Sequence, residues 1–284
     1  MNISVIIVNY KNYELTEQCV KSVINTVESK LDYEIIIIDN NSQNESFNYL
    51  KNKFKEYDFI KVIENNKNVG FGAANNLAAS KATSEYLLFL NPDVVALDDS
   101  ILSMYNRILN DENTGLISCK LLNGDMTLQY SCRRFMKFGD FLFSRTPLRH
   151  LIQSNRANVI DDDYLMKDYD HASEKKVDWV MGSCMLLSKE TFNKVGGFSK
   201  EYFMYFEDVD LCYKINAINK GVLYYPEAKM IHLHKQQSKK NINKLTFIHL
   251  SSMIKFYKKI YKNNKRGIMG INTNQINMTE VEDD

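Results

Sequence analysis

Residues 1–109 alternate between short apolar runs and stretches with helical spacing, and this alternation limits the fold more than any other feature of the chain. The apolar runs are rich in Ile, Val and Leu, which is typical of strands buried on both faces. Strands that alternate with helices predict an α/β fold built on a doubly wound, mostly parallel sheet. The predicted strands are residues 3–8, 34–38, 60–63 and 86–90, and the predicted helices lie near 15–27, 47–54, 70–80 and 98–109.

The second half of the chain is less regular. Residues 123–176 mix aromatic and charged side chains without a clear period, and we expect an irregular, partly helical insert there. Regular elements are expected again as a strand at 177–187, a short helix at 189–195 and a helix from Glu207 to Gly221. Strands at 222–225 and 229–231 and a basic amphipathic helix at 248–261 complete the prediction.

The composition argues against several classes of protein. The formal net charge of +1 gives no overall attraction to nucleic acid. No apolar run reaches the ~18 residues expected of a membrane-spanning helix. The five cysteines are scattered, which favours reduced thiols over a disulfide framework or a zinc site. The N-terminus shows no signal-peptide pattern, so we expect a cytoplasmic protein.

The strand at 86–90 ends abruptly in Asn91-Pro92-Asp93. Proline cannot donate to a strand ladder and keeps the residue before it out of helical geometry, so the strand must stop there. Asp93 then stands at the carboxyl edge of a central strand, where open α/β sheets bind ligands. A carboxylate oxygen there suits Mg²⁺ or Mn²⁺ carried by a diphosphate. The alternative is a turn in which Asp93 caps the following helix.

Two other predicted strands also end in polar residues, Asn9-Tyr10 and Asp39-Asn40. If the strands are parallel, these residues share one edge of the sheet with Asp93. Asp39 is placed to accept a hydrogen bond from a nucleotide base or ribose, or else to cap the next helix. The Gly- and Ala-rich segment 68–76 opens a helix and allows a ligand close to the backbone. It matches neither the dinucleotide fingerprint nor a P-loop, which weakens both of those interpretations.

Two further groups could carry chemistry. Glu207 and Asp208 follow an aromatic run at the start of a predicted helix. Desolvation would raise the pKa of such a carboxylate and the helix dipole would oppose that, so it is a candidate general base. Ordinary acidity at a helix N-terminus is the alternative. His232 and His234 close a strand, where an imidazole binds a metal or diphosphate or has a structural role.

Taken together, these positions resemble the family 2 glycosyltransferases, which are inverting enzymes of GT-A fold, and within them the bacterial rhamnosyltransferase-like branch. The resemblance covers about residues 3–260, and its motifs are specific as an ordered set. They are Val8-Asn9-Tyr10, Ile38-Asp39-Asn40-Asn41-Ser42, Asn68-Val69-Gly70-Phe71-Gly72 with Asn75-Asn76, Leu90-Asn91-Pro92-Asp93, Trp179-Val180-Met181-Gly182-Ser183, Val195-Gly196-Gly197-Phe198, Tyr205-Phe206-Glu207-Asp208-Val209-Asp210-Leu211 and Ile231-His232.

The resemblance implies a role for each residue. Asp93 would hold Mg²⁺ or Mn²⁺ on the donor diphosphate, and His232, with His234 as a rival, would complete the metal site. Asp208 would be the base that deprotonates the acceptor hydroxyl. The implied donor nucleotide-binding residues are Asn9, Tyr10, Asp39, Asn68, Gly70, Asn76 and Asn91. The implied acceptor and sugar pocket contains Trp179, Gly182 and Glu207.

The sequence departs from the family pattern at two places. Asn91 stands where many members carry aspartate, although this branch often has the substitution. Lys235-Gln236-Gln237 replaces the glycine-containing sequence that often precedes Ser238.

The implied activity is inverting transfer of a sugar from a nucleoside-diphosphate sugar, dTDP-rhamnose or a UDP-hexose, to a hydroxyl. The acceptor would be a glycan or lipid-linked glycan in bacterial surface polysaccharide synthesis. The implied domain covers residues 1–240, with a donor half to about 120 and an acceptor half after it. A helical extension at 241–266 and a mobile polar tail at 267–284 would follow. A nucleotidyltransferase and a non-catalytic nucleotide-sugar-binding subunit are the alternatives.

The predicted helix at 248–261 places apolar residues near one face and lysines opposite. Such a helix can dock on an anionic membrane surface, which would bring the protein to the inner face of the cell membrane. The alternatives are that its apolar face packs on the protein's own core or forms a homodimer interface.

Overall fold

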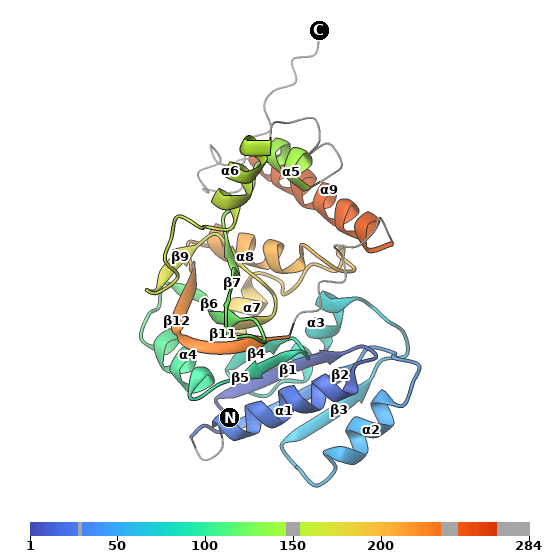
Figure 1. The fold of residues 1–284 in the computed structure, drawn as a ribbon. Coiled ribbons are helices and arrows are strands. Elements are labelled where there is room, and N and C mark those ends of the chain that lie inside the picture. Colours follow the sequence, from blue (N-terminus) through green and yellow to red (C-terminus); the bar gives the residue numbers. More distant parts are fainter. Residues whose placement is uncertain (28–29, 146–153, 234–243, 266–284) are drawn as a thin grey trace.

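The computed structural model describes residues 1–27, 30–145, 154–233 and 244–265 (Figure 1). Its centre is a mixed sheet with the strand order β3-β2-β1-β4-β11-β6-β12-β5, to which β7 and β9 also pair. The first four strands are parallel in unbroken register, which confirms the predicted α/β class and this half of the sheet. They are β1 (Ile3–Asn9), β2 (Tyr33–Asp39), β3 (Ile60–Glu64) and β4 (Tyr86–Leu90).

Helices cover both faces of the sheet, because successive residues of each central strand are apolar. Ile35 and Ile37 of β2 belong to one buried cluster, and Ile36 and Ile38 belong to the other. The first cluster includes residues of α1 (Tyr13–Val27), α2 (Ser46–Lys53) and α4 (Ser100–Leu109). The second includes residues of α3 (Phe71–Lys81), α7 (Lys189–Lys194), α8 (Glu207–Ala217) and α9 (Lys244–Lys265).

The rest of the sheet differs from the sequence prediction. β11 (Cys184–Ser188) runs antiparallel between β4 and β6 (Thr114–Leu122). The two short strands predicted at 222–225 and 229–231 are one strand, β12 (Gly221–His232), whose pairing with β6 is irregular around Pro226. Proline has no N–H to donate, which explains the interruption that the sequence showed. Neither β6 nor β5 (Val94–Ala96) was predicted.

The single strand predicted at 177–187 is wrong. The segment forms β9 (Lys175–Val177), β10 (Trp179–Val180) and β11 in turn. Between β10 and β11, the Met181 N–H donates to the Ser131 carbonyl and the Gly182 N–H donates to a side chain. These bonds take the place of strand pairing. β10 pairs instead with β8 (Cys132–Arg133).

The insert at 123–176 is partly helical, as expected. Besides β8 and β9 it contains β7 (Leu128–Gln129), α5 (Phe138–Arg145) and α6 (Ser154–Tyr164). Figure 1 shows α5, α6 and α9 grouped at the end of the molecule that lies opposite β3 and α2. The predicted tail at 267–284 lies outside the described residues.

Candidate active site

The carboxyl ends of β1 and β2 bring Asn9 and Asp39 side by side, as their parallel register requires. Asn9 Nδ2 donates a 2.6 Å hydrogen bond to Asp39 Oδ2, and the backbone N–H and hydroxyl of Ser42 donate to the same carboxylate. Asp39 is only 1% exposed. Helix α2 begins at Ser46 behind an N-cap at Glu45, so the alternative that Asp39 caps this helix is wrong.

Tyr10 and Asn68 lie on loops at the same edge. The Tyr10 ring is 46% exposed, and Lys11 Nζ lies 5.3 Å from its centroid. Asn68 Oδ1 accepts hydrogen bonds of 3.0 Å from Asn40 Nδ2 and from the Gly70 N–H. Asn40 directly follows β2, so its bond to Asn68 joins the loop before α3 to the end of β2. An exposed aromatic ring therefore stands beside an ordered set of amides.

The glycine-rich opening of α3 is packed against the protein itself. Gly70 has φ +86°, and a Cβ there would lie 2.2 Å from the Phe203 carbonyl oxygen, so only glycine fits. Asn76 Nδ2 donates to the Phe198 carbonyl at 2.7 Å, while its Oδ1 accepts from the Phe198 N–H at 2.9 Å. Both ends of the Asn76 amide hold Phe198, in the segment that follows α7. We therefore assign Asn76 a structural role and do not retain it as a donor ligand.

Asp93 and His232 are brought together by a strand that the sequence did not predict. β5 follows the turn at once and pairs with β12, and α4 begins only at Ser100 behind Asp99. The alternative that Asp93 caps the next helix is therefore wrong. Asp93 Oδ1 lies 3.3 Å from His232 Nε2, with the carboxylate 21% exposed and the imidazole buried. The rival His234 lies outside the described residues.

The donor atoms of this pair fit Mg²⁺ or Mn²⁺. A carboxylate oxygen suits either cation, and an imidazole nitrogen suits a transition metal. Within residues 1–27, 30–145, 154–233 and 244–265, there is no group of three or more His, Cys, Asp or Glu side chains that could hold a metal ion. A cation held by Asp93 and His232 would thus need further oxygen ligands, which a phosphate or water supplies.

One short segment links the two ends of the site. The Asn91 N–H donates to the Ser183 carbonyl at 3.0 Å, and the side chains of these residues lie 3.5 Å apart. The neighbouring Gly182 N–H donates to Asp208 Oδ2 at 2.9 Å. A Cβ at position 182 would lie 3.3 Å from the Asp208 Cβ, so glycine permits this approach. Adjacent residues therefore hold Asp208 on one side and the turn that carries Asp93 on the other.

The backbone before α8 is strained. Tyr205 and Phe206 both have positive φ, at 67° and 68°, a conformation that costs a bulky residue on the order of 1–2 kcal/mol. Helix α8 then begins at Glu207. Asp208 is partly exposed, whereas Glu207 is 6% exposed. The strained turn presents one carboxylate outward and buries the other.

The two carboxylates have different surroundings. Burial, and after it the charge of Asp208, raise the pKa of Glu207 well above its ordinary value. Burial also raises the pKa of Asp208, but the N–H groups of Gly182 and Val209 oppose the shift. Glu207 Oε2 has no hydrogen-bond partner among the described residues. These two N–H groups favour the ionised form of Asp208, whereas burial favours the protonated form of Glu207.

Arg133 is a site residue that the sequence did not identify. It pairs with Trp179 across β8 and β10, and its guanidinium carbon lies 5.2 Å from the Tyr164 ring and 5.9 Å from the Trp179 ring. Burial raises the pKa of Asp208, and the Arg133 charge is one of the influences that oppose this rise. Trp179 is 8% exposed and donates its indole N–H to the Arg134 carbonyl. Only the unpredicted pairing of two short strands reveals this arrangement.

Helix α9 packs on the protein's own core, which confirms that alternative for one of its faces. Its buried apolar residues are Met253, Phe256, Tyr257 and Ile260. The Tyr257 hydroxyl donates to the Met136 carbonyl at 2.6 Å, and Lys259 pairs with the buried carboxylate of Asp210 at 2.5 Å. Because Asp210 belongs to α8, this ion pair ties α9 to the helix that carries Asp208.

A second face of α9 is exposed. Its apolar residues recur at helical spacing and are 67%, 37%, 37% and 45% exposed; they are Phe247, Leu250, Ile254 and Tyr261, respectively. Lys255, Lys258 and Lys262 are also exposed. In the described part of the chain, no helix is both long and apolar enough to cross a membrane.

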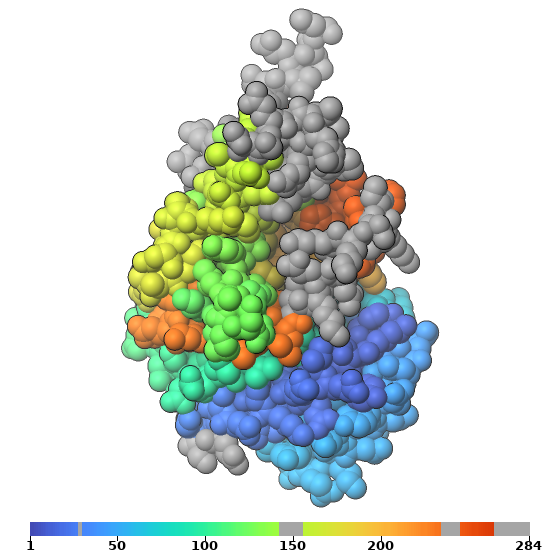
Figure 2. Space-filling view, viewed as in Figure 1, coloured from blue at the N-terminus to red at the C-terminus, as the bar shows by residue number. Residues whose placement is uncertain are grey.

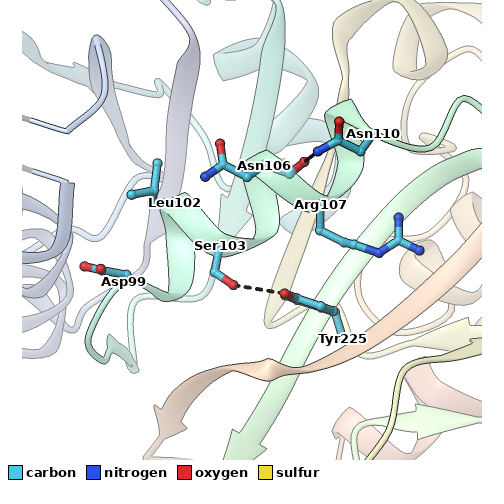
Figure 3. Close-up of a pocket in the computed structure, with 7 residues that line it drawn as sticks. All are labelled: Asp99, Leu102, Ser103, Asn106, Arg107, Asn110 and Tyr225. Carbon is cyan, nitrogen blue, oxygen red and sulfur yellow. Dashed lines mark hydrogen bonds between the residues drawn. The ribbon is translucent and has the colours of Figure 1, made fainter.

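Two shallow hollows lie outside this site. The larger, of about 450 Å³, follows α4 and reaches Tyr225 of β12 (Figure 3). Its polar groups bond to one another, since Asn110 Nδ2 donates to the Asn106 carbonyl and Ser103 Oγ to the Tyr225 hydroxyl. The second, of about 360 Å³, lies between α1 and the loop after β5. Neither is lined by a candidate site residue.

Comparison with known proteins decides the family. The model of glycosyl transferase family 2 matches residues 4–210, more than half of the chain. The chain belongs to this family. Rhamnosyltransferase WbbL of Escherichia coli K12 is 28% identical over 232 residues, which cover 79% of this chain and 81% of WbbL. The N-acetylglucosaminyl-diphospho-decaprenol L-rhamnosyltransferase of Mycobacterium tuberculosis H37Rv is 24% identical over 204 residues. These cover 65% of this chain and 62% of that protein.

Solved structures of other glycosyltransferases share the fold. GalNAc-T7 with UDP, GalNAc and Mn²⁺ aligns with a TM-score of 0.68 at 18% identity, over 94% of this chain and 50% of that one. The Pyrobaculum calidifontis mannosyltransferase PcManGT with GDP-Man and Mn²⁺ aligns with a TM-score of 0.60 at 15% identity. The alignment covers 92% of this chain and 64% of that one. These likenesses confirm the predicted GT-A fold. The relatives confirm the resemblance to the rhamnosyltransferase-like branch of family 2.

Proposed function

We propose that this family 2 glycosyltransferase moves a sugar, with inversion, from dTDP-rhamnose or a UDP-hexose to a hydroxyl of a glycan or lipid-linked glycan. One observation carries the proposal. Gly182 and Ser183 hold Asp208 and the Asn91-Pro92-Asp93 turn on either side of one segment, which sets a base beside a diphosphate-binding edge. The rhamnosyltransferase relatives favour rhamnose as the sugar and a role in surface polysaccharide synthesis.

Asp208 is the proposed base. Its carboxylate is partly exposed and accepts from the Gly182 N–H, which favours its ionised form, and the pKa of Glu207 beside it is raised by burial. It would accept the proton of the acceptor hydroxyl as the oxygen attacks the anomeric carbon. A single base and one displacement invert the anomeric centre, so no second carboxylate nucleophile is needed.

Asp93 and His232 are the proposed ligands of Mg²⁺ or Mn²⁺. When bound, the cation neutralises the diphosphate of the leaving nucleotide. Asn91 orients the turn through Ser183, which leaves Asp93 as the charged group of the motif. The Mn²⁺ in the two similar structures supports this assignment as an analogy.

The nucleotide is proposed to lie at the ends of β1 and β2. The exposed Tyr10 ring offers a surface for stacking on the base. From the part of the chain that the structure describes, Asp39 Oδ1 accepts one hydrogen bond, from the Ser42 N–H, and a second lone pair there suits an N–H of the base. Asn9 fixes the Asp39 carboxylate, and Asn68 with Gly70 fixes the neighbouring loop. We propose a donor half to about residue 120 on this basis.

The acceptor and the transferred sugar are proposed to lie against Trp179, Gly182 and Glu207. Gly182 bonds to Asp208 and Glu207 precedes it, while Trp179 pairs with Arg133 across β8 and β10. Arg133 adds a positive charge that favours ionised Asp208. The acceptor half, residues 121–240, would supply this wall of the site.

The exposed face of α9 is proposed to dock on an anionic membrane surface. Phe247, Leu250, Ile254 and Tyr261 form its apolar stripe, and Lys255, Lys258 and Lys262 lie beside it. Each basic residue near such a surface contributes ~1 kcal/mol. The ion pair between Lys259 and Asp210 then connects the docked helix to α8, beside a lipid-linked acceptor.

Flotation with vesicles tests this docking. We expect the protein to float with vesicles that contain anionic phospholipid, and a Lys255→Glu/Lys258→Glu variant to stay in the soluble fraction. Lys55→Glu, at a side chain that is 66% exposed and distant in sequence from α9, is the matched control. Recovery of the unaltered protein in the soluble fraction with every vesicle would refute docking. A concentration-dependent dimer abolished by Phe247→Ser would assign the stripe to a second copy instead.

A screen of nucleotide sugars tests the transfer itself. Thermal unfolding is measured with each donor in the presence of Mn²⁺ or Mg²⁺, and the donors that raise the Tm are then offered with acceptors. We expect dTDP-rhamnose or a UDP-hexose to stabilise the protein and to release its nucleotide only when an acceptor is present. Binding without transfer across lipid-linked acceptors would indicate a non-catalytic subunit. Nucleotide incorporation from a triphosphate would indicate a nucleotidyltransferase.

A further inference from the structure

A chain of three amide and imidazole contacts runs from the β6–β7 hairpin to His232. Asn123 Nδ2 donates to the Leu128 carbonyl at 3.4 Å and to Thr127 Oγ1 at 2.9 Å. A carbonyl oxygen can only accept, so the amide nitrogen of Asn123 must face it. Asn123 Oδ1 consequently faces the other way, where it accepts from Gln129 Nε2 at 3.0 Å.

The orientation of the Gln129 amide in turn determines which nitrogen of the His232 ring carries the proton. Because Gln129 Nε2 donates to Asn123, the oxygen Oε1 is the atom that faces His232, at 2.6 Å from Nδ1. Oε1 carries no hydrogen, so the proton of this bond must belong to Nδ1. In a neutral ring the other nitrogen, Nε2, then carries a lone pair, and it is the atom that lies 3.3 Å from Asp93 Oδ1.

The burial of His232 and the pairing of the surrounding strands favour a fixed orientation of its ring. His232 is 2% exposed, and β7 and β12 both pair with β6, so their positions are set by one sheet. In Figure 2 the green segment that includes β7 lies against the orange strand β12. The imidazole is therefore held at one nitrogen by Gln129 and faces Asp93 with the other.

We infer that Gln129, held by Asn123, is a positioning residue that selects the Nδ1–H tautomer of His232 and thereby directs the Nε2 lone pair to the cation of the nucleotide-sugar donor. The inference rests on the proposed function, which assigns Asp93 and His232 to that cation. Partners of this kind orient a ligating imidazole and keep its metal-binding nitrogen unprotonated. Their loss typically lowers metal affinity ~10–100-fold.

The tautomer is tested without metal or donor. Long-range ¹H–¹⁵N correlation spectra of the full chain labelled with ¹⁵N-histidine distinguish the ring nitrogens, and the His232→Gln variant assigns the signals. We expect the neutral ring of His232 to carry its proton on Nδ1 and not on Nε2. In Gln129→Leu this preference should be lost. A neutral ring with its proton on Nε2 and none on Nδ1 in the unaltered protein would overturn the inference, whether or not a cation binds there.

The effect on the cation is tested by titrating Mn²⁺ calorimetrically into the protein with dTDP or, in a parallel arm, UDP. We expect Gln129→Leu to lower the Mn²⁺ affinity at least ~10-fold, and Gln129→Glu, which keeps an acceptor oxygen, to restore it. Unchanged affinity and an unchanged tautomer in Gln129→Leu would reduce Gln129 to a packing residue. Absence of Mn²⁺ binding by the unaltered protein would overturn the proposed metal site, which the tautomer spectrum does not depend on.

Discussion

The buried carboxylates at the two ends of the candidate site differ in their hydrogen bonding. Asp39, at the end of parallel strands, accepts three hydrogen bonds from Asn9 and Ser42. Glu207, at the start of α8, is buried beside the charge of Asp208, and its Oε2 has no partner within the described part of the chain. The proposed donor edge, the strand ends that carry Asn9 and Asp39, is thus a satisfied network. Burial and neighbouring charge instead raise the pKa of Glu207, which lies beside the proposed base, Asp208. A raised pKa of this kind makes the start of α8 a candidate site of proton transfer.

The backbone shows the same contrast. The strands that carry Asn9 and Asp39 pair in unbroken register. The turn that presents Asp208 contains two consecutive left-handed residues, Tyr205 and Phe206. Strain at such a turn persists only when surrounding contacts impose it. Here the Phe203 carbonyl accepts from the Phe71 N–H, and Lys259 of α9 pairs with Asp210.

The largest expected effect is on the base. Asp208→Asn should lower the transfer rate by ~10²-fold or more, because the acceptor hydroxyl loses its proton acceptor. Donor affinity should change little, since Asp208 lies on the other side of the Gly182 segment from the diphosphate edge. Steady-state kinetics and calorimetry with the nucleotide separate the two quantities. Near-normal turnover would move the role to Glu207 or Asp210 and would remove the contrast.

The satisfied network is tested by Asp39→Ala. Removal of this carboxylate leaves donors of Asn9 and Ser42 buried without an acceptor, at a cost of ~1–3 kcal/mol in the free energy of unfolding. Urea denaturation measures the loss. Asp32→Ala, in the loop before β2, changes a carboxylate that is 66% exposed and serves as control. Equal stability of both variants would show that the donor edge is not held by its own hydrogen bonds.

Asp93→Ala should weaken the divalent-dependent part of donor binding ~10-fold or more and leave the fold intact, because the carboxylate is partly exposed. Calorimetric titration of the nucleotide, with Mn²⁺ and with a chelator, gives this difference. Asp99→Ala is the matched control, because it removes a nearby carboxylate whose side chain is 61% exposed and which pairs with Lys30 instead of His232. If the metal dependence of both variants equals that of the unaltered protein, Asp93 is not a metal ligand.

The smallest effect concerns the pH dependence of stability. Glu207 has a raised pKa in the folded protein, whereas the unfolded chain has the ordinary value of ~4.3. Its stabilising contribution is therefore complete below that value and is lost as the pH rises toward the folded pKa. Glu207→Gln should remove this loss, so the difference in Tm between variant and unaltered protein should grow from pH 5 to pH 8. A constant difference would place Glu207 in an ordinary environment.

Much of the donor edge could be predicted from local sequence pattern. The alternation of apolar runs and helical spacing predicted β1, β2, β3 and β4, because each element carries its own period. The acceptor side was predicted less well. The pattern missed β5 and joined β9, β10 and β11 into one strand, since two- and three-residue strands are too short to show a period. It also missed β6, although that strand has nine residues.

What the sequence determined by itself is the parallel half of the sheet and the common edge of Asn9, Asp39 and Asn91, because parallel strands end at one edge. Only the tertiary structure decided how the site is assembled. The pairing of β5 with β12 places Asp93 beside His232, and the pairing of β8 with β10 brings Arg133 to Trp179. The physical reason is that these contacts join segments far apart in the chain, whose pairing no local period records.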